Sequence, residues 1–287
     1  MTIIIDGKGI ATRLKSDLKE KISKLRIPPC LAVVIVGNDL ASKIYVKNKE
    51  KSCKECGIRS IKYELPSDIS EIKLLELIEK INNDDKIDGL LVQLPLPKHI
   101  DKKKVILAIS PRKDVDCFTP VNIGNMFNGT FDFETSLLPC TPKGCIRLIK
   151  SVCSDLSGKK ACIVGRSNIV GKPASQLLLN EDCTIKIIHS KTENLSDEIK
   201  WADILIVAVG KPKFITADMI KDGVIVIDVG MNRYNEKLCG DVDFNNVINK
   251  VHAITPVPGG VGPMTIAMLM ENMYNIVKSQ KSESLEP

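Results

Sequence analysis

The segment Gly158–Pro173, GKKACIVGRSNIVGKP, constrains the fold more than any other stretch of the chain. Its four apolar residues Ala161–Val164 are followed by Gly165, a polar run and Gly171, where a helical pattern begins. This order predicts a strand, a tight turn and a helix whose N-terminus presents backbone N–H groups to a phosphate. The spacing differs from G-x-G-x-x-G, because Ser167 occupies the place of the second glycine. The segment alone therefore fits either a nucleotide-binding turn or an ordinary βα turn.

The residues after the next strand favour a nucleotide, and NADP rather than NAD. The strand is predicted over Thr184–His189, and Ser190, Lys191 and Thr192 follow it. In an NAD site, an acid about 20 residues after the glycine turn binds the ribose hydroxyl. Here no acid stands at this position. Arg166 in the glycine turn offers a bidentate fork that suits a 2′-phosphate.

Two further strands, Ile204–Val209 and Val224–Val229, are each closed by a glycine. Strands alternating with short helices at this spacing predict a parallel, doubly wound sheet of the Rossmann type. We place this domain at residues 140–263. It is preceded by a linker over Thr135–Pro142 and a boundary near Pro139.

The N-terminal part predicts a second α/β domain, residues 1–139, completed by the C-terminal helix at about 264–287. Helices are expected over 10–25, 41–56 and 71–81, and strands over 31–36, 61–65 and 89–97. In the helix over 71–81, the apolar face is predicted to hold Ile72, Leu75 and Ile78. The fold class is thus α/β, with two domains.

Composition excludes several classes of function. The net charge of +6 is spread over separate lysines without interleaved aromatic residues, so we expect no nucleic-acid partner. No apolar run approaches the roughly 18 residues of a membrane span, and the first residues do not resemble a targeting segment. The ten cysteines lack the spacing of a zinc site, so we expect no metal, reduced structural thiols and a cytoplasmic location.

Several polar side chains of the N-terminal part are candidates for a functional site. Tyr45 and Lys49 are four residues apart on one helix face, one turn after Ser42. Gln93 interrupts a buried strand near its carboxyl end, where ligands of open α/β sheets bind. Asp116 lies in a loop flanked by apolar residues. Each also has an ordinary interpretation: a solvated lysine, a core aromatic residue, a core amide or a solvated acid.

Eight motifs in order resemble the bifunctional methylenetetrahydrofolate dehydrogenase/methenyltetrahydrofolate cyclohydrolase family. Together they span nearly the whole chain and are far more specific than any one of them. They are Ala41-Ser42 with Tyr45-Val46-x-x-Lys49, Val92–Pro97, Lys113–Asp116, Pro139–Pro142, Gly165–Pro173 (GRSNIVGKP), His189–Thr192, Gly240–Val242 and Pro258–Thr265.

The resemblance implies two reactions in one cleft between the domains. Hydride passes from 5,10-methylenetetrahydrofolate to NADP, and water then opens the methenyl product to 10-formyltetrahydrofolate. Lys49 would be the general base and acid, held by Gln93, while Tyr45 stacks on the folate and Asp116 accepts from the pterin N–H groups. Further folate contacts would come from Ser42, Pro258, Gly259, Gly260 and Thr265. Cofactor contacts would come from Gly165, Arg166, Ser167, Gly171, Ser190 and Met231. The family also implies a homodimer.

One position departs from the family pattern. The residue after Asp116 is usually glycine, and here it is Cys117. If this position needs a positive φ, the cysteine strains the loop that holds Asp116. Three alternatives are a dehydrogenase without cyclohydrolase activity, a shikimate-type NADP dehydrogenase, and a non-catalytic NADP-binding regulator. Lys49 and Gln93 argue against the first. The Tyr45-x-x-x-Lys49 pair and the QLPLP strand end argue against the second, and Lys49 with Asp116 argues against the third.

Overall fold

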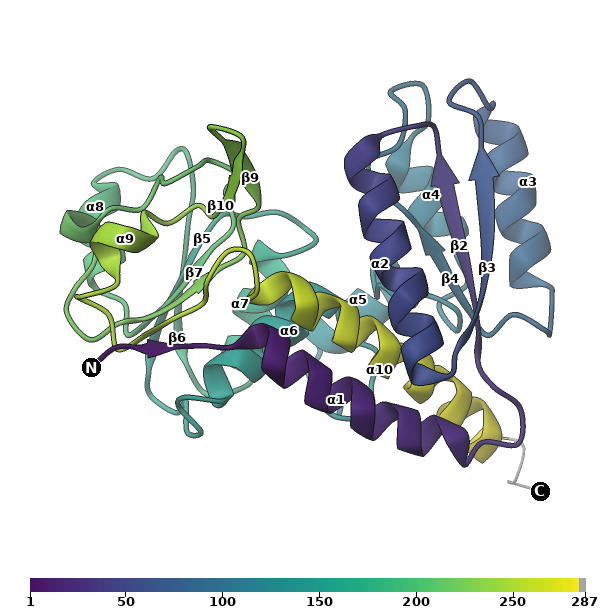
Figure 1. Cartoon of the computed structure of the whole chain (residues 1–287), viewed down its shortest axis with the longest axis horizontal. Coiled ribbons are helices and arrows are strands. Elements are labelled where there is room, and N and C mark those ends of the chain that lie inside the picture. Colours follow the sequence, from purple (N-terminus) through teal and green to yellow (C-terminus); the bar gives the residue numbers. More distant parts are fainter. Residues whose placement is uncertain (284–287) are drawn as a thin grey trace. The chain divides into compact units, whose positions relative to one another are not determined.

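The computed structural model describes residues 1–283, which form two compact units (Figure 1). The large-sheet unit comprises residues 1–11 and 139–265, and the small-sheet unit comprises residues 12–138 and those from 266 onward. The chain passes from one unit to the other within α1 (Gly7–Ser23), at Leu138–Pro139, and within α10 (Val261–Glu283).

The large-sheet unit is built on six parallel strands. Their order across the sheet is β1-β11-β8-β7-β5-β6. The strands are β1 (Ile3–Ile4), β5 (Lys160–Val164), β6 (Thr184–Ile188), β7 (Ile204–Val207), β8 (Ile225–Asp228) and β11 (Ala253–Ile254). The order reverses between β5 and β7, because the chain leaves β5 for one neighbour and returns to the other. Ligands of such sheets bind beyond the carboxyl ends of the strands at that reversal.

Helices cover both faces of this sheet, which confirms the doubly wound prediction. On one face lie α6 (Cys140–Lys150) and α7 (Gly171–Leu179); on the other lie α8 (Leu195–Lys200), η1 (Ala217–Met219) and α9 (Phe244–Val247). A hairpin of β9 (Asn232–Tyr234) and β10 (Lys237–Cys239) follows β8. Alternate residues of the strands face the two helical layers, so the inner strands β7, β8 and β11 are buried throughout, whereas the edge strands β1 and β6 are partly exposed.

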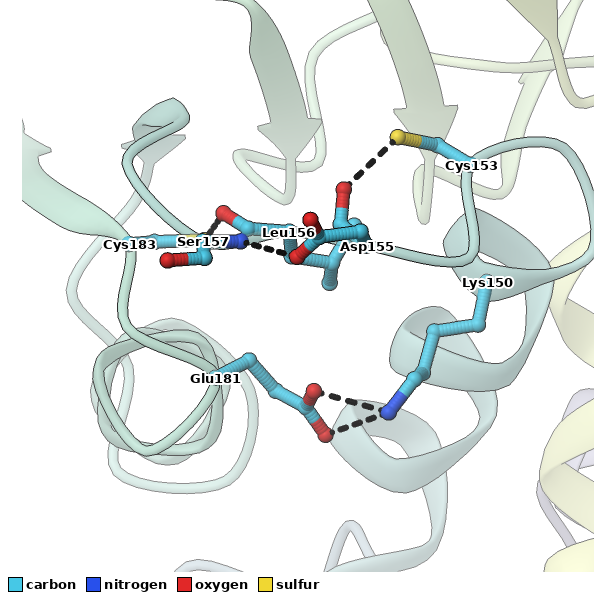
Figure 2. Close-up of polar contacts among 7 residues, drawn as sticks. All are labelled: Lys150, Cys153, Asp155, Leu156, Ser157, Glu181 and Cys183. Carbon is cyan, nitrogen blue, oxygen red and sulfur yellow. Dashed lines mark hydrogen bonds and ion pairs between the residues drawn. The ribbon is translucent and has the colours of Figure 1, made fainter.

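Side-chain bonds also connect the segments at the amino ends of β5 and β6. Lys150 Nζ at the end of α6 donates to both carboxylate oxygens of Glu181, at 2.8 and 2.7 Å (Figure 2). Cys183 Sγ, just before β6, donates to the carbonyl of Leu156 at 3.3 Å. The first contact joins the end of α6 to the loop before β6, and the second joins the loop before β5 to the loop before β6. They secure the scaffold and leave the opposite edge for binding.

The small-sheet unit has three parallel strands in the order β3-β2-β4. They are β2 (Cys30–Val36), β3 (Arg59–Leu65) and β4 (Gly89–Val92), and the helices are α1, α2 (Leu40–Cys56), α3 (Glu71–Asn82), α4 (Lys102–Ala108) and α5 (Pro120–Phe127). Helices α2 and α3 lie on opposite sides of the sheet, and α4 joins α3 (Figure 1). A Cβ added at Gly89 would stand 2.3 Å from Met273 Sδ, so α10 packs directly on β4.

Sequence predictions differ from the structure at several points. The strand predicted over 89–97 ends at Val92, before the two prolines and before Gln93. Ile72 is 69% exposed, so the predicted apolar face of α3 was wrong there; the buried residues are Leu74, Ile78 and Ile81. The predicted linker ends earlier, because α6 begins at Cys140 and Pro142 lies in its first turn, where a missing N–H costs nothing.

A further difference concerns the N-terminus. Residues 1–11 belong to the large-sheet unit, whereas the sequence placed them with the N-terminal domain. The reason is pairing at long range: Ile3 and Ile4 form β1 beside Ala253 and Ile254 of β11. A two-residue strand has no periodicity that the sequence could reveal.

Candidate active site

In the small-sheet unit, Lys49 and Gln93 are hydrogen-bonded across elements 44 residues apart in sequence. Lys49 Nζ donates to Gln93 Oε1 at 3.0 Å. Gln93 follows β4 directly; its backbone N–H donates to Val34 O at 2.8 Å and its Nε2 donates to Leu94 O at 2.6 Å. The amide oxygen is therefore aimed at Lys49 by bonds that use the rest of the residue.

Helix α2 carries the other predicted residues of this group. Asp39 caps it by accepting from Ser42 N at 2.8 Å, and Ser42 is buried. Tyr45 and Lys49 are both half-buried, one turn apart. Burial raises the pKa of the Tyr45 phenol, so the ring carries no charge near neutral pH. A neutral, half-buried ring beside an amine suits contact with a planar ligand.

Asp116 lies within the electrostatic reach of Lys49. Burial raises the pKa of the Asp116 carboxyl, the charge of Lys49 lowers it, and the charge of Asp114 raises it. The two acids have different surroundings. Asp114 is buried and accepts from Phe118 N at 3.1 Å and Thr119 N at 2.7 Å, so it shapes the loop, whereas Asp116 remains partly exposed.

Cys117 has φ 58, in the left-handed region that favours glycine. The positive φ that would strain a cysteine at this position is thus present. The side chain is fully buried, and its Sγ donates to Leu137 O at 3.2 Å. A non-glycine residue in this conformation costs about 1–2 kcal/mol. The buried thiol contact offsets part of that cost.

In the large-sheet unit, the glycine turn lies at the switch point between β5 and β7. Gly165 has φ 124, and a Cβ there would be 2.4 Å from Ala208 O. A Cβ on Gly171 would be 2.1 Å from Gly165 O. Ser167 Oγ accepts from Val170 N at 3.1 Å and from Gly171 N at 3.3 Å, so it closes the turn. This compact cradle fits a phosphate at the N-terminus of α7.

Two exposed polar residues flank this cradle on adjacent strands. Arg166 follows β5 and Ser190 follows β6, which pair in parallel, so both stand at the same edge of the sheet. The turn that carries Ser190 is closed by Thr192, whose Oγ1 accepts from His189 N at 2.9 Å. A guanidinium and a hydroxyl at this edge suit a phosphate group. Met231, 43% exposed, follows β8 at the same end of the sheet.

The Pro258–Gly260 loop belongs to the large-sheet unit. Lys8 N donates to Gly259 O at 2.8 Å, and a Cβ on Gly7 would be 2.2 Å from Gly260 O. The start of α1 therefore packs directly on this loop. Thr265 Oγ1 lies 3.0 Å from Thr141 Oγ1 and donates to Val261 O at 3.2 Å.

Sequence reasoning missed a pair of buried acids beside the switch point. Asp241 accepts from the backbone N–H groups of Val209, Gly210 and Lys211 at 2.7–2.9 Å, and so orders the loop after β7. Asp228 accepts from Asp241 N and Val242 N, both at 2.9 Å. Burial raises the pKa of Asp228 to about 6; backbone bonds lower it and the charge of Asp241 raises it. The sequence carried one signal of this pair, the Gly-Asp-Val turn at 240–242. In the structure, glycine is needed at 240 because a Cβ there would collide with the Asp228 carboxylate.

Two further observations bear on the kind of site. Within residues 1–283, no helix combines the length and apolar character needed to cross a bilayer. In the same part of the chain, no three His, Cys, Asp or Glu side chains gather as metal ligands would.

Comparison with known proteins identifies two family domains. Residues 5–116 match the catalytic domain of tetrahydrofolate dehydrogenase/cyclohydrolase, and residues 139–281 match its NAD(P)-binding domain. The chain is 55% identical over 282 residues to a protein of Agathobacter rectalis named bifunctional protein FolD, covering 97% of this chain and 100% of the relative.

Solved structures agree with this match. The bifunctional FolD dehydrogenase/cyclohydrolase of Campylobacter jejuni superposes with a TM-score of 0.94 at 48% identity, covering 98% of this chain and 100% of that one. The Trypanosoma brucei dehydrogenase-cyclohydrolase, solved with NADP cofactor and an inhibitor, has a TM-score of 0.93 at 34% identity, with 98% of each chain covered.

Proposed function

The chain belongs to the tetrahydrofolate dehydrogenase/cyclohydrolase family, and from that premise we propose which residues perform its two reactions. The enzyme oxidises 5,10-methylenetetrahydrofolate to 5,10-methenyltetrahydrofolate and then hydrolyses it to 10-formyltetrahydrofolate. The first step transfers hydride to NADP+. The second adds water to the methenyl carbon, releases one proton and breaks a ring C–N bond.

The bond from Lys49 Nζ to Gln93 Oε1, at 3.0 Å, is the observation that carries the assignment of the hydrolytic step. Lys49 takes a proton from the attacking water and returns one to the departing ring nitrogen. Gln93 fixes the direction of the amine and offers no competing charge. General acid–base catalysis of this kind contributes about 100- to 10,000-fold.

Asp116 and Tyr45 hold the folate. The partly exposed Asp116 carboxylate accepts from the pterin amino and ring N–H groups, which are paired donors that suit its two oxygens. Tyr45 stacks on the pterin face, and Ser42 lies one turn away on the same helix. Pro258, Gly259, Gly260 and Thr265 contribute further folate contacts from the large-sheet unit.

Binding of NADP falls to the turn after β5 and its neighbours. NADP supplies the hydride acceptor; the chain supplies position, which is the main requirement of hydride transfer. The backbone around Gly165 and Gly171 and the N-terminus of α7 would hold the pyrophosphate. Arg166, Ser167 and Ser190 would hold the NADP phosphates, and Met231 would lie near the adenosine or ribose.

The remaining assignments are organisational. We propose that folate chemistry resides mainly in the N-terminal domain completed by α10, that cofactor binding resides in residues 140–263, and that the enzyme acts as a homodimer. Small-molecule folates are its partners, rather than nucleic acid or membrane. The buried, dispersed thiols support a reducing compartment, and hence the cytoplasm.

A spectroscopic assay tests the proposal. Purified enzyme is supplied with methylenetetrahydrofolate and NADP+ or NAD+, or with methenyltetrahydrofolate alone, for wild type, Lys49→Ala and Lys47→Ala. Lys47 is an exposed lysine on the same helix and serves as the matched control. We expect NADPH formation and hydrolysis by wild type and Lys47→Ala, with hydrolysis lost in Lys49→Ala.

Each other outcome refutes one part of the proposed function. Wild type that forms NADPH but leaves methenyltetrahydrofolate intact is a dehydrogenase alone. Hydrolysis that survives in Lys49→Ala refutes the role of that lysine. A clear preference for NAD+ over NADP+ refutes the assignment of Arg166 and Ser190.

A further inference from the structure

Both neighbours of Asp116 are tied to one short segment of the chain. Asn272 Nδ2, on α10, donates to Val115 O at 2.8 Å and to Leu138 O at 2.9 Å. Cys117 Sγ donates to Leu137 O at 3.2 Å. The residue before Asp116 and the residue after it are therefore both joined to Leu137–Leu138, the first through the amide of Asn272.

These bonds lie in the interior. Asn272 is 0% exposed, as are Val115, Cys117 and Leu138. An amide nitrogen has two hydrogens, and both carbonyls are within hydrogen-bonding distance of this one. Without the amide, both carbonyls would lose this donor where water has little access, and the loss of a buried hydrogen bond weakens the loop conformation that it stabilises.

Backbone and carboxylate bonds secure the two ends of the same loop. Leu90 N donates to Lys113 O at 2.7 Å on one side, and Asp114 accepts from Phe118 N and Thr119 N on the other. The Asn272 amide contacts the middle of the loop, beside the residue that faces the ligand. We infer that Asn272 is a positioning residue for folate binding, acting through the backbone of residues 115–117 on Asp116. This inference rests on the proposed role of Asp116.

The consequence is specific to binding. Asp116 contacts the pterin, away from the reacting carbon, so its displacement weakens ground state and transition state alike and raises KM more than it lowers kcat. A misplacement near 1 Å costs up to about 100-fold in kcat/KM, and for a group that binds the pterin this loss falls mainly on KM. For Asn272→Leu we therefore expect KM for methylenetetrahydrofolate to rise about 10- to 100-fold, with kcat changed several-fold at most.

The same helix offers a matched control. Asn275 Nδ2, one turn further along α10, donates to Glu134 O at 2.8 Å and is also buried. Asn275→Leu removes the same type of bond from a loop carbonyl remote in sequence from Asp116. It reports what loss of a buried amide from α10 does to the fold alone.

The experiment measures KM, kcat and thermal unfolding for wild type, Asn272→Leu, Asn272→Ser, Asn275→Leu and Asp116→Asn. The serine variant keeps one hydroxyl donor and decides the matter if the leucine variant does not fold. We expect a raised KM for both Asn272 variants and for Asp116→Asn, with Asn275→Leu within about twofold of wild type.

Two results overturn different statements. If Asp116→Asn raises KM but neither Asn272 variant exceeds the Asn275 control, the positioning inference is wrong. If Asp116→Asn leaves KM unchanged, the substrate role of Asp116 is wrong, and any effect of Asn272 on KM must arise by a route other than Asp116.

Discussion

Replacing Gly171 with alanine tests the cofactor cradle most directly. The new Cβ would stand 2.1 Å from Gly165 O and 2.8 Å from Gly165 C. Since Cβ atoms essentially never approach other atoms closer than 3.0 Å, the two backbone segments must separate by about 0.9 Å. Both partners are backbone, so no flexible side chain can absorb this movement.

The expected cost has two parts. Forced backbone shifts of this kind destabilise by about 1–3 kcal/mol, against a gain near 1 kcal/mol for alanine over glycine in a helix. The larger effect is on NADP. A misplacement near 1 Å costs up to about 100-fold in catalysis, and we expect a loss of the same order in NADP binding when the turn shifts by this distance. At a concentration of 100 times the wild-type Kd, NADP+ stabilises the wild type by about 2.7 kcal/mol; a variant bound 100-fold more weakly gains only about 0.4 kcal/mol.

The assay is titration of NADPH fluorescence, with unfolding measured in the presence and absence of NADP+. Gly124→Ala is the control, because a Cβ at that helical glycine meets nothing within 4 Å. It is expected to stabilise slightly and to leave NADPH binding unchanged. Binding by Gly171→Ala within threefold of wild type would refute the account of the turn.

Three further predictions concern titration and strain. Cys117→Gly is expected to change the free energy of unfolding by less than about 1 kcal/mol, because glycine relieves the strain of the left-handed conformation while the thiol contact is lost. Cys145 is equally buried but lies in helix α6, so Cys145→Gly should lower the free energy of unfolding by more than about 2 kcal/mol. Chemical denaturation measures both. Asp228 has a pKa of about 6 in the folded state against an ordinary 3.8. Its contribution to stability is therefore largest below pH 3.8, falls as pH rises to about 6, and is flat above. Asp228→Asn should abolish a decrease of about 3 kcal/mol over that range, and equal pH slopes in both proteins would contradict this. Because Asp116 binds folate as the carboxylate, KM for methylenetetrahydrofolate in the dehydrogenase reaction should rise as pH falls through the raised pKa of Asp116. Lys49→Ala removes a charge that lowers this pKa, so the rise in KM should move to higher pH. If the pH profile of KM is the same in both proteins, Lys49 does not affect the titration of Asp116.

Much of the site was predictable because its chemistry is local. The turn between Gly165 and Gly171 follows from strand, glycine and helix patterns within one short segment, and the spacing of Tyr45 and Lys49 places both on one helix face. Gln93 was noticeable as an amide at the end of an apolar run, although the strand itself ends at Val92. The strain at Cys117 was predicted conditionally, because the family usually has glycine at this position beside Asp116 and a positive φ would strain a cysteine there.

The sequence by itself determined the order of elements, the family, and the residue types at the glycine turn and beside Lys49. Only the tertiary structure decided what depends on distant pairing. The two-residue β1 joins β11 from the opposite end of the chain, and the Asp241 carboxylate reaches three N–H groups of the loop after β7. Asn272 meets Val115 O across 157 positions. Periodicity reports which face of an element is apolar, but a single buried donor or a strand of two residues has no period, so its partner is known only when the chain has folded.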